Sequence, residues 1–172
     1  KPVAVIHALA EIANGYGCGR DMHVGDTIIG IKGRVGFEAA APLIIIKAHH
    51  LLEKHTLVKE QLYWKELIAN YYGQLMHEAQ YLNPVMRDME KFLESTQSSV
   101  NGTVEVLLRP YNFFVLGCKS QYDLMSSKFG EYGEMNKSYT GRDVVGFTKV
   151  LSNPLKIYYS LHEDEKEQAS KN

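Results

Sequence analysis

The residues best suited to chemistry form two clusters of glycine and arginine near the start of the chain. They are Gly17-Cys18-Gly19-Arg20 and Gly30-Ile31-Lys32-Gly33-Arg34, the second continuing to Gly36-Phe37-Glu38. Arginine offers a planar fork of donors to carboxylate or phosphate, and glycine lets the backbone approach a bound group. The β-rich run Thr27-Ile28-Ile29 lies between them. We expect one strand over about 26–32, with clusters at its ends that contact anions or serve structure.

The first cluster also invites interpretation as a phosphate loop. A dinucleotide loop follows a strand and opens a helix. The glycine-rich stretch Gly15–Gly19 instead follows the helix expected over Val3–Asn14 and precedes a strand. The order favours a helix C-cap and a tight turn, because glycine is the preferred residue just past a helix end.

Histidines gather in one segment, where His49, His50 and His55 lie near Glu53. On a helix His49 and Glu53 share a face, whereas the other two align poorly with them. No paired cysteines or His-Glu-x-x-His motif accompany them. The pattern therefore favours ordinary packing or surface histidines, and we expect no metal site.

Aromatic side chains recur along the next helix. We interpret this stripe as helix core or as a subunit interface, since aromatic residues dominate both. A cofactor pocket is the weaker interpretation, and the sequence holds no evident nucleophile or catalytic triad. The stripe comprises Tyr63, Trp64, Tyr71 and Tyr72.

The elements that position these residues indicate an α+β fold, with a small, mainly antiparallel sheet packed with several long helices. Thr56 and Asn83 are expected N-caps, and Asn83-Pro84 is a typical helix start. The run Leu43–Ile46 is apolar all round and predicts a buried helix. Further helices and strands are expected over Ala39–His55, Leu57–Gln80, Pro84 to before Gln97, Asp143–Leu151, Leu155–His162, Thr103–Arg109 and Phe113–Gly117.

Composition excludes several classes of protein. Lysine and arginine number 19 against 20 acidic residues, so no excess of positive charge marks a nucleic-acid or membrane-surface binder. No apolar run reaches the roughly 18 residues that span a membrane. The two cysteines, Cys18 and Cys118, fit reduced thiols, so we expect a cytoplasmic protein. One globular domain is expected over 1–162, followed by a charged, disordered tail over 163–172.

The motifs, in their order and spacing, resemble the C-terminal domain of argininosuccinate synthases. That family carries a Gly-x-Gly-Arg turn, then Gly-x-Lys-x-Arg, then an aromatic residue followed by glutamate. Its later segments are an Ala-His-x-x-Leu-Glu helix, a Gly-x-Val-x-Val strand and an Ala-Thr-Gly-Phe stretch. The corresponding segments here are Gly17–Arg20, Gly30–Arg34, Phe37-Glu38, Ala48–Glu53, Asn101–Val106 and Asp143–Phe147.

This resemblance implies a homotetrameric ligase of arginine biosynthesis that joins citrulline to aspartate with ATP and Mg²⁺. The ureido oxygen of citrulline is adenylated with release of pyrophosphate, and the aspartate amine then displaces AMP to give argininosuccinate. The family's ATP-gripping Ser-Gly-Gly-Leu-Asp-Thr-Ser loop belongs to an N-terminal domain, and this sequence does not contain it. We therefore expect nucleotide and metal to bind outside this chain, which is inactive alone and carries no catalytic residue.

Two positions depart from the family's pattern for contacting citrulline. A glutamate and a tyrosine of the family align with Gly25 and Phe37. An uncompensated α-ammonium would forfeit a charge-assisted hydrogen bond of about 1.5–3 kcal/mol. Either Asp26 supplies the carboxylate after a one-residue shift, or the substrate is an N-acylated citrulline whose acidic acyl group would meet Lys32 or Arg34. Neutral drift, with a ligand from the other domain, is an equally open alternative.

Four charged residues of the clusters are candidates for anion contacts or for salt bridges that hold the strand. The structural role is favoured for Arg20 and Glu38, and substrate contact for Lys32 and Arg34. A non-catalytic self-association or scaffold domain is the alternative function, because the chain lacks an evident nucleophile, metal cluster or phosphate loop.

Overall fold

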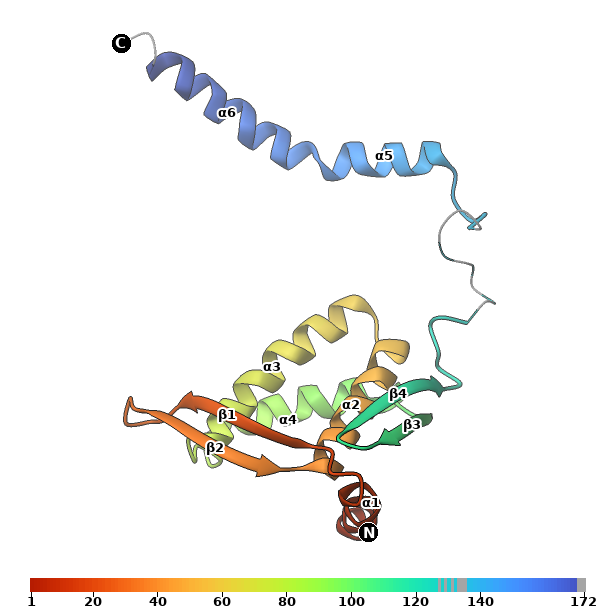
Figure 1. The fold of residues 1–172 in the computed structure, drawn as a ribbon. Coiled ribbons are helices and arrows are strands. Elements are labelled where there is room, and N and C mark those ends of the chain that lie inside the picture. Colours follow the sequence, from red (N-terminus) through yellow and green to blue (C-terminus); the bar gives the residue numbers. More distant parts are fainter. Residues whose placement is uncertain (127, 129, 131, 133–135, 170–172) are drawn as a thin grey trace. The chain divides into compact units, whose positions relative to one another are not determined.

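The computed structural model describes residues 1–126, 128, 130, 132 and 136–169, and its contacts separate two compact units, Lys1–Met125 and Ser126–Asn172. Helices and antiparallel strands confirm the predicted α+β class, but among the described residues the strands form two separate hairpins (Figure 1). The first unit contains α1 (Pro2–Asn14), β1 (Arg20–Asp26), β2 (Lys32–Glu38), α2 (Ala40–Thr56), α3 (Lys59–His77), α4 (Pro84–Thr96), the 3₁₀ turn η1 (Gln97–Ser99), β3 (Thr103–Arg109) and β4 (Asn112–Lys119). The second contains α5 (Gly141–Leu151) and α6 (Asn153–Ala169).

The core of the first unit lies where α1 and α2 meet the β3–β4 hairpin. Ala13, Cys18, Ala40 and Ile44 are buried there, and partly buried side chains of β3 and β4 pack against them. Burying an aliphatic side chain such as Ile44 contributes about 1.5–3 kcal/mol. The β3–β4 hairpin confirms the strands predicted over this part of the chain.

The strand predicted over 26–32 is wrong, because residues 27–31 form the turn that joins β1 to β2. The Gly30 N–H donates to the Thr27 carbonyl at 2.9 Å, and the Thr27 hydroxyl donates to the Ile31 carbonyl at 2.6 Å. Gly30 has φ +79°, a conformation that glycine adopts at little cost. The β-propensity of Ile28 and Ile29 predicts a strand, but these local hydrogen bonds close a turn instead. The first cluster therefore leads into the start of β1, where Arg20 lies opposite Glu38, whereas Gly30–Arg34 lie at the other end of the hairpin, in the turn and at the start of β2.

The boundary between α2 and α3 also differs from the prediction. Thr56 is the last residue of α2, and its hydroxyl donates to the Leu52 carbonyl at 2.9 Å, so it does not cap α3. Val58 occupies the cap position, and its N–H donates to the Gln61 side chain at 3.2 Å. The predicted cap of α4 is confirmed, since the Asn83 side chain accepts from the Val85 N–H.

Many apolar side chains that were predicted to lie in the core are exposed in this chain. Tyr63, Trp64 and Tyr71 are each about half exposed, so the helix-core interpretation is wrong for them. Ile46 of α2 is also exposed, although Ile44, two residues earlier on the same helix, is buried. The apolar residues of α4 are buried or half-buried, namely Val85, Met86, Met89, Phe92 and Leu93.

The second unit consists of two successive helices joined through Ser152. A reciprocal capping box starts α5, in which the Asp143 carboxylate accepts from the Thr140 N–H at 2.8 Å. The helix predicted to end near His162 continues to Ala169, and the last residues of the predicted tail, 170–172, lie outside the described residues. Among the described helices, none is long and apolar enough to cross a membrane.

Candidate functional site

The predicted site residues all lie on the β1–β2 hairpin. The two strands of this hairpin contact mainly each other, and Figure 1 shows them extending to the turn that joins them. The residues on β1 are Arg20, Gly25 and Asp26, and those on β2 are Lys32, Arg34, Phe37 and Glu38.

The register of the hairpin sorts these residues onto two faces. Pairing runs from Arg20 opposite Glu38 to Asp26 opposite Lys32. Successive side chains of a strand point to opposite faces, and cross-strand partners share a face. One face, the charged face, thus carries Arg20, Asp26, Lys32, Arg34 and Glu38. The other, the Gly25 face, carries Gly25 and Phe37, together with Asp21, His23, Gly33 and Val35.

Two cross-strand ion pairs lie on the charged face. Arg20 pairs with Glu38 at one end, and the Lys32 Nζ lies 2.5 Å from the Asp26 carboxylate at the other. All four side chains are more than half exposed, so each pair contributes at most about 1 kcal/mol. Arg34 lies between them, opposite Val24. Asp26 is therefore ion-paired on the face opposite Gly25. It does not supply a carboxylate on the Gly25 face, so the expected one-residue shift is not seen.

The Gly25 face carries the apolar side chains of Val35 and Phe37, the imidazole of His23 at its centre and one carboxylate, Asp21. A Cβ built at Gly25 would lie 2.5 Å from the His23 Nε2, so the His23 ring occupies the space that a side chain at residue 25 would need. Val35 and Phe37 expose apolar surface on the same face. Sequence reasoning missed His23. If the segment 20–26 had been predicted as a strand, the two-residue spacing of His23 and Gly25 would have placed them on the same face.

A second polar cluster surrounds the buried carboxylate of Glu53 on α2. Lys65 donates to it at 2.7 Å and Gln97 at 3.0 Å, and the side chain of Glu53 is fully buried. Burial raises the pKa of Glu53, but the hydrogen bonds from Lys65 and Gln97 together outweigh it and hold the pKa below its usual value. Because the cluster joins α2, α3 and η1, it fixes how these elements pack.

The histidines of this region make hydrogen bonds and close contacts with side chains packed around them, as the packing interpretation expects. The His49 Nε2 lies 2.8 Å from the Gln97 side-chain oxygen, and His50 Nδ1 lies 3.6 Å from the Glu53 carboxylate. His55 lies 3.0 Å from Asp123, whose pKa is lowered by the Met125 N–H and then by His55. Within the described residues, no group of three or more His, Cys, Asp or Glu side chains is arranged to hold a metal ion.

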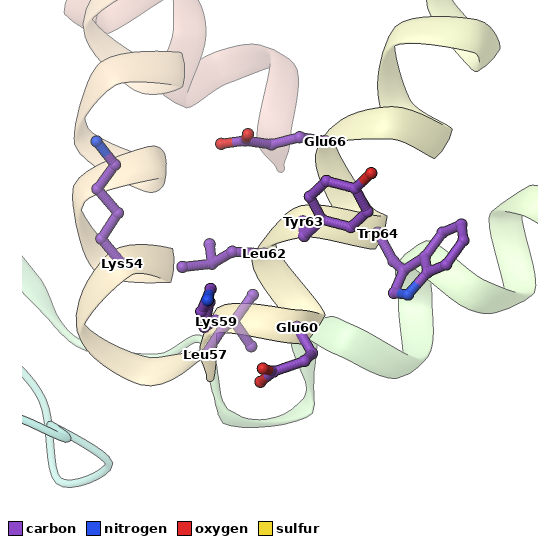
Figure 2. Close-up of a pocket in the computed structure, with 8 residues that line it drawn as sticks. All are labelled: Lys54, Leu57, Lys59, Glu60, Leu62, Tyr63, Trp64 and Glu66. Atoms are coloured by element: carbon purple, nitrogen blue, oxygen red, sulfur yellow. The ribbon is translucent and has the colours of Figure 1, made fainter. Parts of the chain in front are cut away.

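A groove of about 660 Å³ lies between the end of α2 and the start of α3. Figure 2 shows Leu62 and Glu66 pointing toward α2, while Trp64 points away on the other side of α3. Tyr63 and Trp64 pack edge to face with ring centroids 5.6 Å apart. The lining mixes lysine, glutamate and aromatic side chains without converging polar groups, so we place the candidate site on the hairpin.

Fold and site together define an α+β domain whose long exposed hairpin presents one face with lysine and arginine side chains and one face with neither. Residues 1–158 match the family model described as the arginosuccinate synthase C-terminal domain. The chain therefore belongs to the argininosuccinate synthase family, as the C-terminal domain, and the resemblance inferred from its motifs is confirmed.

Three relatives, each named argininosuccinate synthase, illustrate the similarity. The protein of Dictyoglomus thermophilum is 32% identical over 149 residues, covering 87% of this chain and 37% of the relative. That of Halalkalibacterium halodurans is 33% identical, covering 97% and 41%, and that of Dehalococcoides mccartyi is 33% identical, covering 96% and 41%. The chain thus spans about two-fifths of the length of these relatives.

Proposed function

We propose that this chain is the C-terminal part of a carbon–nitrogen ligase that joins a citrulline-type substrate to aspartate in arginine biosynthesis. The observation that carries the proposal is membership in the family over residues 1–158. In the complete enzyme, the ureido oxygen of the substrate attacks the α-phosphorus of ATP and pyrophosphate leaves. The aspartate amine then attacks the ureido carbon, and AMP leaves with the former ureido oxygen.

The part of this chain in that reaction is to present the β1–β2 hairpin to the substrate. ATP and Mg²⁺ would supply the leaving group and charge neutralisation from the rest of the enzyme. The described residues do not offer an acidic or histidine cluster for the metal, and the glycine-rich stretch before β1 forms turns with positive φ at Gly17 and Gly19. We therefore propose that ATP and Mg²⁺ bind mainly outside this chain, and that the chain is inactive by itself.

The exposed apolar surface supports assembly into a homo-oligomer, for which we propose a tetramer. Side chains such as Trp64 on α3, Phe147 on α5 and Tyr159 on α6 are more than half exposed in the single chain. Surfaces of this kind are typical of subunit or domain interfaces. Free thiols at Cys18 and Cys118 support the cytoplasm as the location.

The experiment that tests the function uses the full-length protein. Purified enzyme is supplied with ATP, Mg²⁺, aspartate and either L-citrulline or an N-acylcitrulline, and AMP and pyrophosphate are measured. We expect release that requires both aspartate and a citrulline-type substrate, and no release from the 172-residue chain alone. Absence of release from the full-length protein with every substrate would refute the proposal.

A non-catalytic scaffold is the second candidate, and the same exposed apolar helices favour it. Analytical ultracentrifugation of the full-length protein distinguishes the two candidates when it is combined with the activity assay. An oligomer that releases AMP supports the ligase, whereas an oligomer without activity supports the scaffold.

A further inference from the structure

The Gly25 face differs from the charged face in what it can offer a substrate. Its described side chains include no lysine or arginine, and its apolar area comes from Val35 and Phe37. The imidazole of His23 lies over Gly25 and is itself exposed. Near Gly25, this face therefore offers one hydrogen-bonding ring and apolar surface, which suits a neutral group better than an ammonium.

Asp21 is the one carboxylate on this face, and it lies too far away to replace a side chain at residue 25. Four residues along a strand separate Asp21 from Gly25, a distance of roughly 13 Å. The Asp21 carboxylate also accepts from the Met22 N–H at 2.6 Å, so it is turned to its own backbone. At Gly25 itself, the group available to a substrate is thus the imidazole of His23.

We propose that His23 is a specificity-determining residue that donates a hydrogen bond to the carbonyl of an acylated α-nitrogen, so the preferred substrate is a citrulline with a neutral N-acyl group. This inference rests on the proposed ligase function. The acyl group packs on Val35, which lies opposite His23, and acylation removes the positive charge that a carboxylate would otherwise have to meet. Lys32 and Arg34 lie on the opposite face, so an acidic acyl group finds no cation beside Gly25.

The test measures kcat/KM of the full-length enzyme with L-citrulline, N-acetylcitrulline and N-succinylcitrulline under saturating ATP and aspartate. We expect N-acetylcitrulline to be the best substrate. In His23→Ala, the ratio of kcat/KM for N-acetylcitrulline to that for citrulline should fall roughly 10-fold, the equivalent of one hydrogen bond. His23→Gln keeps an N–H donor and should retain most of the ratio.

A double variant tests the same idea in the opposite direction. His23→Ala combined with Gly25→Glu removes the overlying ring and installs a carboxylate for a free α-ammonium. The kcat/KM for L-citrulline should then rise by about 10- to 100-fold, as expected for a charge-assisted hydrogen bond. Met22→Ala, on the opposite face of the same strand and similarly exposed, is the control and should leave the ratio unchanged.

The results that would overturn the role of His23 differ from the result that would overturn the ligase function. A preference of the wild-type enzyme for free citrulline, or a ratio that His23→Ala leaves unchanged, overturns the role of His23 while the ligase function stands. If the wild-type enzyme prefers citrulline and Asp21→Asn loses citrulline turnover, then Asp21 binds the α-ammonium of the substrate. That result also overturns the role of His23. A preference for N-succinylcitrulline contradicts the neutral acyl group. No AMP release with any substrate overturns the proposed function itself.

Discussion

Removing Lys65 should destabilise the first unit, because it strands the buried carboxylate of Glu53. In Lys65→Met, Gln97 remains as a neutral donor at 3.0 Å, but the ammonium at 2.7 Å is lost. Breaking a buried ion pair by removing one partner costs about 3–5 kcal/mol. Gln97 and the two nearby histidines offset part of this loss, so we expect about 3 kcal/mol. For a chain of this size that corresponds to a fall in Tm of roughly 6–12 °C.

Equilibrium urea unfolding followed by circular dichroism gives the free energy of unfolding, and the double variant supplies the sharpest comparison. Glu53→Gln combined with Lys65→Met removes both charges and should be more stable than Lys65→Met alone. Lys91→Met is the control, since Lys91 and Glu94 form an exposed pair at 3.4 Å. It should change stability by less than about 0.5 kcal/mol. A cost below about 1 kcal/mol for Lys65→Met, or equal costs for the single and double variants, would refute the reasoning.

The buried pair of Glu53 and Lys65 also predicts how the free energy of unfolding depends on pH. The pKa of Glu53 is lowered in the folded protein, so its contribution to stability is present above the ordinary value of 4.5 and is lost as the pH falls below it. Lys65→Met removes the hydrogen bond and the charge of Lys65, both of which lower the pKa of Glu53, so this pKa should be higher in the variant than in the wild type and protonation should relieve the stranded charge. The difference in unfolding free energy between wild type and Lys65→Met should therefore shrink as the pH falls toward 4. A difference that stays constant from pH 7 to pH 4 would contradict this.

Further predictions concern turns and caps. Gly19→Ala should cost roughly 3 kcal/mol or more, since φ is +79° and the new Cβ would lie 2.5 Å from the Ala40 Cα. Gly30→Ala has the same φ but open space, so it should cost only about 1 kcal/mol; equal costs in urea unfolding would contradict this reasoning. Asn83→Ala should remove the cap of α4 and cost about 1 kcal/mol, whereas Asn83→Asp should retain most of that stability.

Some features of this chain are predictable because they depend on residues close together in sequence. The Asn83-Pro84 start of α4 needs only a side-chain oxygen and a fixed φ within one turn. The β3–β4 hairpin is likewise local, with a Pro110–Tyr111 turn between two β-rich runs. The order of the motifs along the chain was enough to predict the family, because the order and spacing of motifs can be read without knowing which residues are in contact.

Other features depend on contacts that the sequence pattern does not contain. The burial of Glu53 requires Lys65 and Gln97 from two other elements, so its role in the packing was not predicted. The exposure of Tyr63 and Trp64 follows from which face of α3 meets α4, and helical periodicity alone does not distinguish a core face from an interface face.

The sequence by itself determined the α+β class, the family and the segment that carries the candidate site. Only the tertiary structure decided how that segment is used. The segment expected to be one strand is the turn Thr27–Ile31 between two flanking strands, and the resulting register separates Gly25 and Phe37 from Lys32 and Arg34. The physical reason is the period of two along a strand, because a change from strand to hairpin reassigns which side chains share a face. That assignment brought His23 over Gly25, a neighbour that no motif had indicated.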